Sequence, residues 1–257
     1  MGREMSLEFA SRGANVVLSS NIEAEIGAVA AECESLAGRA IAVVADVTDE
    51  SDLSDLVDVA VGEFAGVDGL VNNAGVIRSS VVSDRGTLSD ITMDDWNQIM
   101  DVNLGGTVRG MKAVIPVMSH ARRGSIINLS SGTVRAPLPG LGPYTTSKFA
   151  IEGITKIAAL ELQEFGIRVN AIQPGGPVNT ALMSPEMGQE VRSRLHQPSV
   201  IRKCAAWLLG DESSLLSGRS FVALEWNRER GLVECPCPSC TTRDLNPGAS
   251  TWSSSAR

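Results

Sequence analysis

The stretch Ser125-Ile-Ile-Asn-Leu-Ser-Ser131, followed after 12 residues by Tyr144-Thr-Thr-Ser-Lys148, indicates how this chain folds and where its chemistry lies. The apolar run that ends at Leu129 is typical of a buried strand, and Tyr144 opens an amphipathic helical pattern. Residues four apart lie on one face of a helix, so the phenol and the ammonium are neighbours. A free tyrosine has a pKa of about 10, and a nearby cation lowers that pKa by favouring the phenolate. The pattern predicts proton transfer at an alcohol or carbonyl oxygen, to which Ser131 presents its hydroxyl.

The same spacing has a structural alternative. A Tyr-x-x-x-Lys pair arises often by chance, and an exposed pair is usually only a solvated helix face. Tyr144 is, however, the only tyrosine of the chain, and other motifs surround it in a fixed order.

Composition and charge exclude several classes of protein. The 257 residues, 43% of them hydrophobic, suffice for one α/β domain with a buried core. The net charge of −8, without a lysine/arginine cluster, argues against nucleic acid or an anionic membrane as partner. No apolar run approaches the ~18 residues that span a bilayer, and the first residues lack the apolar core of a secretory signal. Five cysteines without such a signal indicate a reducing compartment, so we expect a cytoplasmic protein without disulfides.

Strand-like apolar runs alternate with longer helical patterns along most of the chain. Strands are expected at residues 15–19, 40–44, 69–72, 126–129, 168–172 and 221–224, and helices at 1–12, 22–36, 49–64, 94–118, 144–165 and 200–209. This alternation predicts an α/β fold with a doubly wound parallel sheet in a single domain. Such sheets bind ligands beyond the carboxyl ends of their strands. Asp46, Asn73, Ser131 and Tyr144 follow strands at that edge and are expected to converge.

The domain is expected to cover residues 1–227, and residues 228–257 are expected to form a disordered tail. The tail has no periodicity and is rich in proline, serine and glycine. The spacing of Cys235, Cys237 and Cys240 hints at zinc, but a structural zinc site needs four ligands, and no histidine or fourth cysteine lies nearby. An inert tail is therefore preferred over metal or redox chemistry, and no metal site is predicted.

Five sequence elements agree in order and spacing with one family. They are Asn72-Asn-Ala-Gly75, Asn103 within Asp101-Val-Asn-Leu-Gly-Gly-Thr107, Asn128-Leu-Ser-Ser131 with Tyr144 13 residues after the serine, Lys148, and Pro174-Gly175 with Thr180. On these elements the chain, from Gly2 to about Asn227, resembles the short-chain dehydrogenase/reductase family. The resemblance implies a Rossmann-like fold and an NAD(P)-dependent oxidoreductase that interconverts a secondary alcohol and a ketone.

The resemblance also implies catalytic roles for four residues. Tyr144 would be the general acid/base, its phenolate favoured by Lys148, which would also hydrogen-bond the nicotinamide ribose. Ser131 would orient the substrate oxygen and stabilise its developing charge. Asn103 would anchor a water that links Lys148 to solvent as a proton relay. Hydride would pass directly between the nicotinamide and the substrate carbon.

Further residues are expected to hold the dinucleotide. The set is Gly2, Ser20, Asp46, Val47, Asn73, Ala74, Gly75, Tyr144, Lys148, Pro174, Gly175, Val178 and Thr180. Asp46-Val47 would contact the adenine, and Asn73 and Gly75 the adenosine ribose side. Val178 and Thr180 would hold the carboxamide and a nearby phosphate. The structural alternatives are a plain strand-to-helix turn at Asn73 and Gly75, and a helix cap at Asp46 or Thr48.

The chain departs from the family pattern at its start. Such proteins open with a strand and a glycine-rich turn that places the pyrophosphate on a helix N-terminus, and Met1-Gly2-Arg3-Glu4 aligns with the end of that turn. The first strand, which the family places between residues 15–19 and 69–72, has no counterpart here. We therefore expect an N-terminally truncated member with unpaired strand edges.

The expected cofactor is NADP or NAD, with a lean to NADP. NAD-preferring members usually carry an acidic residue after the second strand, and Ser20, followed by Asn21, stands at that place. No arginine or lysine adjoins it to bind a 2′-phosphate, although Arg3 could reach.

The expected substrate is a lipophilic alcohol or ketone, because Met183, Pro185 and Met187 lie in the segment that forms the family's substrate lid. Family members commonly form dimers or tetramers through helices that match residues 94–118 and 144–165, and we expect a homo-dimer or homo-tetramer. An alternative of a different class is a truncated, non-catalytic chain that only binds a partner subunit. The missing glycine-rich turn motivates that alternative.

Overall fold

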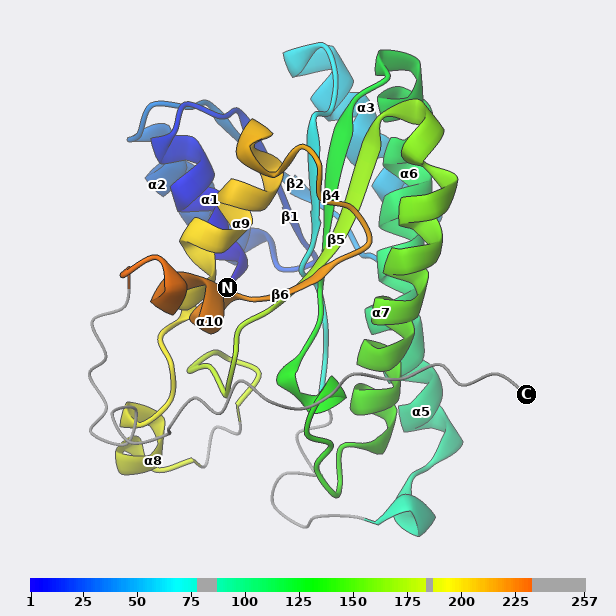
Figure 1. Cartoon of the computed structure of the whole chain (residues 1–257), viewed down its shortest axis with the longest axis vertical. Coiled ribbons are helices and arrows are strands. Elements are labelled where there is room, and N and C mark those ends of the chain that lie inside the picture. Colours follow the sequence, from blue (N-terminus) through cyan, green and yellow to red (C-terminus); the bar gives the residue numbers. More distant parts are fainter. Residues whose placement is uncertain (78–86, 184–186, 233–257) are drawn as a thin grey trace.

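Two parallel β-sheets form the central layer of the molecule, and helices cover both faces (Figure 1). The first sheet pairs β1 (Val16–Ser20) with β2 (Ala40–Val44). The second has the order β3-β4-β5-β6, formed by Gly69–Asn72, Gly124–Leu129, Ile167–Gln173 and Ser220–Val222. The computed structural model describes residues 1–77, 87–183 and 187–232, and all strand pairings within these ranges are parallel. The α/β class is confirmed, but the strands form two sheets rather than one.

The helices lie on the two sides of this layer. On one side are α1 (Gly2–Ser11), α2 (Glu23–Glu34) and α9 (Arg202–Leu209) (Figure 1). On the other side are α3 (Glu50–Phe64), α5 (Met93–Met100), α6 (Gly106–Ala121) and α7 (Gly142–Glu161) (Figure 1). Two short helices, α8 (Gln189–Ser193) and α10 (Ala223–Glu229), follow the last long strand. None of the helices in the described ranges has the length and apolar character needed to cross a bilayer.

The helix expected at residues 94–118 is interrupted. Between α5 and α6 lies a π-helical turn, Asp101–Gly105, which inserts one extra residue into the helical path. Asn103 sits in this turn with its side chain fully buried and bonded away from the helix. Apolar spacing does not reveal such a turn, because the pattern continues on either side of it.

The end of the domain also differs from the expectation. Residues 223–224 were expected to end a strand, but β6 stops at Val222 and α10 begins at Ala223. The helix is favoured because it buries the apolar side chains of Ala223, Leu224 and Trp226. Of the expected tail, residues 228–232 are described. Cys235, Cys237 and Cys240 lie outside the described residues, as does Pro185 of the lid segment.

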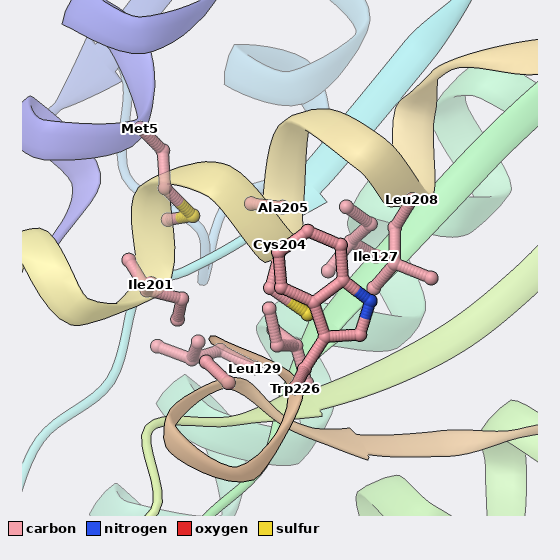
Figure 2. Packing of buried hydrophobic residues seen from close by; sticks show 10 residues of the cluster. Met5, Ile127, Leu129, Ile201, Cys204, Ala205, Leu208 and Trp226 are labelled. Atoms are coloured by element: carbon pink, nitrogen blue, oxygen red, sulfur yellow. The ribbon is translucent and has the colours of Figure 1, made fainter. Parts of the chain in front are cut away.

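Each sheet has its own hydrophobic core. Ile126 and Ile127 of β4 are fully buried and point to opposite faces of the second sheet. Figure 2 shows the cluster around Ile127, where Trp226 and residues of α9 pack against β4. A smaller third cluster, Ala10, Leu18, Ala30, Cys33 and Ala40, belongs to the first sheet.

In the described part of the chain, β1 and β3 are edge strands of their sheets, as are β2 and β6. The sequence predicted such unpaired edges at β1 and β3. Both strands end at the same side of the molecule, and the predicted site residues follow them there.

Candidate active site

A cavity of about 2340 Å³ extends to the carboxyl ends of the strands. It is lined by all but one of the residues predicted to carry function: Gly2, Ser20, Asp46, Val47, Asn73, Ala74, Gly75, Ser131, Tyr144, Lys148, Pro174, Gly175, Val178 and Thr180. The exception is Asn103, which lies behind the wall. Topology therefore brings together residues that are spread over most of the chain.

Tyr144 and Ser131 approach the cavity from different elements. Tyr144 lies in the first turn of α7, and Ser131 caps a short 3-10 helix, Gly132–Val134, directly after β4. The Ser131 Oγ accepts a hydrogen bond of 3.2 Å from the Thr133 main-chain N–H, which orients the serine side chain. Burial raises the pKa of Tyr144 above its ordinary value of 10.0, and a side-chain hydrogen bond with Ser131 acts more weakly in the opposite direction.

Lys148 is almost completely enclosed, with 3% of its surface exposed. Its Nζ donates a hydrogen bond of 2.8 Å to the Leu129 main-chain oxygen and lies 5.7 Å from the centroid of the Tyr144 ring. Burial lowers the pKa of Lys148 to about 8. The lowering of the Tyr144 pKa that the Lys148 spacing predicted is not found in this structure, because burial, which disfavours the phenolate, has the largest effect on that pKa.

Asn103 joins three segments instead of facing the cavity. Its Oδ1 accepts a hydrogen bond of 2.7 Å from the Val76 N–H, and its Nδ2 donates bonds of 3.0 Å to the Val76 oxygen and to Ser147 Oγ. Its own main-chain oxygen accepts a bond of 2.8 Å from Thr107 Oγ1. These contacts fix the loop after β3 against α7, whereas the predicted water relay stays a prediction.

Ser147 is a site residue that the motif comparison missed. It is fully buried, accepts the bond from Asn103, and donates a bond of 2.7 Å to the main-chain oxygen of Tyr144. It thereby couples Asn103 to the turn of α7 that carries Tyr144 and Lys148. A serine three residues after a helical residue often bonds back to that residue's carbonyl, so the spacing held a usable signal.

Two glycines are required by the shape of the cavity wall. A Cβ at Gly75 would lie 3.2 Å from Asn103 Oδ1 and 3.7 Å from Lys148 Nζ, so a larger residue would press on both. Gly175 has φ +108°, and a Cβ there would come within 2.5 Å of Leu224 Cβ. The close approach of these loops to the cavity therefore depends on glycine.

Asp46 forms a turn and does not cap a helix. Its Oδ1 accepts hydrogen bonds from the main-chain N–H (2.8 Å) and from Oγ1 (2.7 Å) of Thr48, and the former is the main reason why the pKa of Asp46 is lowered. The N-cap of α3 is Asp49, whose side chain accepts a hydrogen bond from the Ser51 main-chain N–H. The capping alternative is therefore excluded for Asp46.

The residues around the cavity fit a dinucleotide. Within the described chain, Lys148 makes a single hydrogen bond, although an ammonium has three donors, and it lines the cavity. The two spare donors suit ribose hydroxyls. Helix α1 begins at the cavity wall with no side-chain cap at Met1, so its first N–H groups suit a phosphate. Gly75 leaves room for a ligand to approach Lys148 closely.

Part of the cavity wall is formed by apolar residues of the segments after β4 and β5. These residues include Ala136, Leu138, Pro139, Leu141, Leu182, Met183 and Met187. Two of the three lid residues singled out in the sequence thus lie in the wall. Arg135, which also lines the cavity, is paired with Glu225 of α10 at 2.9 Å.

Comparisons with known proteins agree with this geometry. A family model described as short chain dehydrogenase matches residues 1–190. A 3-alpha-(or 20-beta)-hydroxysteroid dehydrogenase of Mycobacterium bovis is 39% identical over 225 residues, covering 86% of this chain and 83% of that protein. A trans-4-hydroxycyclohexanecarboxylate dehydrogenase of Sinomonas cyclohexanicum is 34% identical, with coverage of 86% for both chains.

Solved structures show the same relationship. The structure of NAD+-bound xylitol dehydrogenase matches with a TM-score of 0.75 and 27% identity, over 86% of this chain and 92% of that chain. The motifs around Tyr144, the parallel α/β architecture and these matches coincide along the same residues. The chain belongs to the short-chain dehydrogenase/reductase family, a family of oxidoreductases that act on CH–OH groups.

Proposed function

We propose that the protein interconverts a secondary alcohol and a ketone, with Tyr144 exchanging the proton at the substrate oxygen. The observation that carries the proposal is the arrangement of Tyr144, Ser131 and Lys148 on one cavity wall, with Lys148 holding unused donors. A bound nicotinamide dinucleotide supplies or accepts the hydride. The raised pKa of Tyr144 keeps the phenol neutral near pH 7. A neutral phenol can protonate a ketone oxygen, and this supports reduction at neutral pH and oxidation at higher pH.

Each of the other residues has a defined part in this scheme. Ser131 donates a hydrogen bond to the substrate oxygen and stabilises negative charge that develops there. Lys148 hydrogen-bonds the ribose hydroxyls through the two donors that Leu129 leaves open. Asn103 and Ser147 position α7, so that Tyr144 and Lys148 keep their places.

Contacts of Arg3 support NAD over NADP, although the sequence leaned to NADP. Arg3 Nε donates a bond of 3.0 Å to Glu32, and Arg3 Nη1 pairs with Glu4 at 2.7 Å. The guanidinium is therefore already neutralised by two carboxylates. Ser20 offers only a hydroxyl, whose oxygen accepts from the Ile22 N–H at 3.1 Å. A 2′-phosphate would add two negative charges beside Glu4 and Glu32 without a free cation, whereas a ribose hydroxyl adds none.

The substrate class that fits best is a lipophilic cyclic secondary alcohol or its ketone. Apolar side chains form part of the cavity wall, with Met183 and Met187 as adaptable packing surfaces. The relatives named for hydroxysteroids and for a hydroxycyclohexane acid act on ring alcohols. A steroid-sized ring system is the first substrate to try.

A homo-oligomer through α7 is supported by an exposed apolar stripe. Phe149, Ile157 and Leu160 are 49%, 50% and 75% exposed, and their spacing puts them on one helix face. Burial of this stripe against a second copy would remove the apolar surface from water. For the location, the free buried thiols of Cys33 and Cys204 support a reducing, cytoplasmic setting.

The test is a Tyr144→Phe variant assayed with NADH, NADPH and a panel of cyclic ketones. The wild-type protein should consume cofactor, and the variant should lose at least about 100-fold in kcat, the usual size of a general acid contribution. Cofactor binding, followed by fluorescence, should be unchanged. Equal turnover in both proteins would contradict the role of Tyr144 as proton donor. If neither protein binds cofactor, the alternative of a non-catalytic chain that binds a partner subunit is favoured.

A further inference from the structure

The charge of the cavity wall differs between the two halves of the chain. The described lining residues that precede β4 include four carboxylates, Glu25, Asp46, Asp68 and Asp101. From β4 onward, the charged side chains among the described lining residues are those of Arg135 and Lys148. The part of the wall that also carries Ser131 and Tyr144 is therefore positively charged and, within the described chain, has no carboxylate of its own.

The two cations of this part of the wall differ in what they can still bind. Lys148 is enclosed, with 3% of its surface exposed, and its spare donors suit the ribose hydroxyls of the dinucleotide. The side chain of Arg135 is 52% exposed. Arg135 is therefore the cation that a substrate can reach from the cavity.

The guanidinium of Arg135 has donors to spare. Its Nη1 and Nη2 donate hydrogen bonds of 3.3 and 2.9 Å to the two carboxylate oxygens of Glu225. A guanidinium has five N–H donors, so the described chain leaves three of them, including the Nε–H, without an acceptor. The edge formed by Nε and one Nη fits a second carboxylate with two parallel bonds. Arg3 shows that one guanidinium of this protein binds two carboxylates, those of Glu32 and Glu4.

The position of Arg135 relative to Ser131 is fixed by one hydrogen-bonded turn. The Val134 N–H donates to the Ser131 oxygen at 3.2 Å, and the Arg135 N–H donates to the Gly132 oxygen at 3.0 Å. A 3-10 turn rises about 2.0 Å per residue, so the Cα atoms of residues 131 and 135 are about 8 Å apart. The serine that faces the reacting oxygen and the arginine thus form a short, rigid pair of contact points.

Glu225 holds the guanidinium from outside the cavity. It is absent from the described cavity wall and belongs to α10, which is fastened by a bond of 3.1 Å from the Leu224 N–H to the Pro174 oxygen. Both side chains of the Arg135–Glu225 pair are about half exposed, and exposed ion pairs are weak. Glu225 can therefore orient Arg135 without preventing it from binding another anion.

We propose that Arg135 is a specificity residue, which binds a carboxylate that the substrate carries away from its reacting oxygen. The proposal rests on the proposed alcohol–ketone chemistry and narrows its substrate class to ring alcohols and ring ketones with an acidic group. Ser131 and Tyr144 hold the reacting end, and Arg135 holds the acidic end. The short turn between Ser131 and Arg135 favours a compact acid, in which few bonds separate the ring from the carboxylate.

The test compares acids with their uncharged amides. Initial rates with NADH are measured for 4-oxocyclohexanecarboxylate, (4-oxocyclohexyl)acetate and 3-(4-oxocyclohexyl)propanoate, each beside its primary amide. For at least one of these pairs, kcat/KM should be about tenfold or more higher for the acid, the range of a charge-assisted bidentate contact. In Arg135→Gln the acid-to-amide ratio should fall to near one. Arg123→Gln removes the same charge from an exposed pair with Asp68 outside the described cavity wall, and it should keep the wild-type ratio.

A second variant leaves Arg135 in place. Glu225→Gln removes the carboxylate that competes with the substrate, so the acid-to-amide ratio should rise by roughly two- to fivefold, the range of an exposed ion pair. If the ratio instead falls to that of Arg135→Gln, the intact ion pair and not the guanidinium is what matters, and the proposal is wrong. This variant decides the question alone if Arg135→Gln fails to fold.

Binding without turnover separates this proposal from the proposed reaction. Isothermal titration calorimetry with cyclohexanecarboxylate, cyclohexylacetate and 3-cyclohexylpropanoate, each against its amide, should show an acid preference that Arg135→Gln removes. Such binding without any turnover would refute the reaction and leave the carboxylate site standing. Turnover without an acid preference in any pair would do the reverse. An acid preference that survives in Arg135→Gln, or a raised KM for NADH in that variant, would also overturn the assignment of Arg135 to the substrate.

Discussion

The Nζ of Lys148 donates a hydrogen bond of 2.8 Å to the main-chain oxygen of Leu129, the last residue of β4. The lysine is thus held at the end of a strand by a neutral acceptor and not by a carboxylate. An ammonium that is buried without a counter-charge is disfavoured, and this explains its pKa of about 8. The protein keeps a destabilising group where the cofactor would bind.

Replacement of Lys148 by methionine is expected to raise the unfolding free energy at pH 7 while abolishing turnover. A fall in pKa from 10.5 to about 8 corresponds to roughly 3 kcal/mol against the charged form. Loss of the bond to Leu129 offsets about 1 kcal/mol of that, which leaves a gain of about 2 kcal/mol. Between pH 8 and 10.5 the unfolded wild-type chain binds more protons than the folded chain, so wild-type stability rises with pH through this window. The advantage of the variant should therefore shrink, and urea unfolding at pH 7 and pH 10.5 measures it. An equal difference at the two pH values would contradict the burial argument.

The pKa of Tyr144 can be measured directly, because this is the only tyrosine of the chain. An ultraviolet titration should show a single phenol with a midpoint above the ordinary value of 10.0. Ser131→Ala removes the hydrogen bond that lowers the pKa, so its midpoint should lie higher still. Ser131→Thr keeps the hydroxyl and serves as the control. A wild-type midpoint below 10 would show that Lys148 outweighs burial, as first expected.

Asn103 is expected to matter for both stability and rate although it does not line the cavity. Asn103→Ala removes the hydrogen-bond partner of Val76 and of Ser147 at a fully buried position. We expect the free energy of unfolding, measured with urea, to fall by about 2–4 kcal/mol. Asn103→Asp keeps the acceptor for the Val76 N–H and loses both donated bonds. In Asn103→Asp, kcat should fall while the KM for the cofactor changes little, because the displaced element is the turn that carries Tyr144. If Asn103→Asp lowers the stability but leaves kcat unchanged, the role of Asn103 is purely structural.

Cofactor preference should respond to Glu32. Glu32→Gln releases one of the two carboxylates that hold Arg3, so NADPH affinity should improve by roughly two- to fivefold, the range of an exposed ion pair. NADH affinity should not change. Glu34→Gln removes the same charge from the same helix without touching Arg3 and is the matched control. If the two variants improve NADPH binding equally, general charge and not Arg3 is responsible.

Local sequence pattern was sufficient to predict most strands and helices and the edge of the sheet at which the site residues meet. Apolar runs such as Ser125–Leu129 bounded by polar turns report burial on both faces, which only central parallel strands experience. Neither the π-helical turn at Asn103 nor the helix begun by Ala223 could be predicted, since both depend on partners distant in sequence, Val76 and Pro174. The direction of the Tyr144 pKa was missed for a similar reason. Spacing shows that a cation is near, but not how much water both groups lose.

The separate core of the first sheet has a consequence for how the molecule comes apart. Ala10, Leu18, Ala30, Cys33 and Ala40 pack with one another, and α1 connects this core to α9 in the rest of the fold. There Met5 enters the core of the second sheet, and Glu4 and Glu8 pair with Arg202 and Lys203 of α9. Because the two sheets share no strand, we expect the N-terminal segment to unfold as a cooperative unit of its own, with a lower stability than the rest. We then expect thermal melting to be a two-step process, in which the part that holds Asp46 loosens before the part that carries Tyr144.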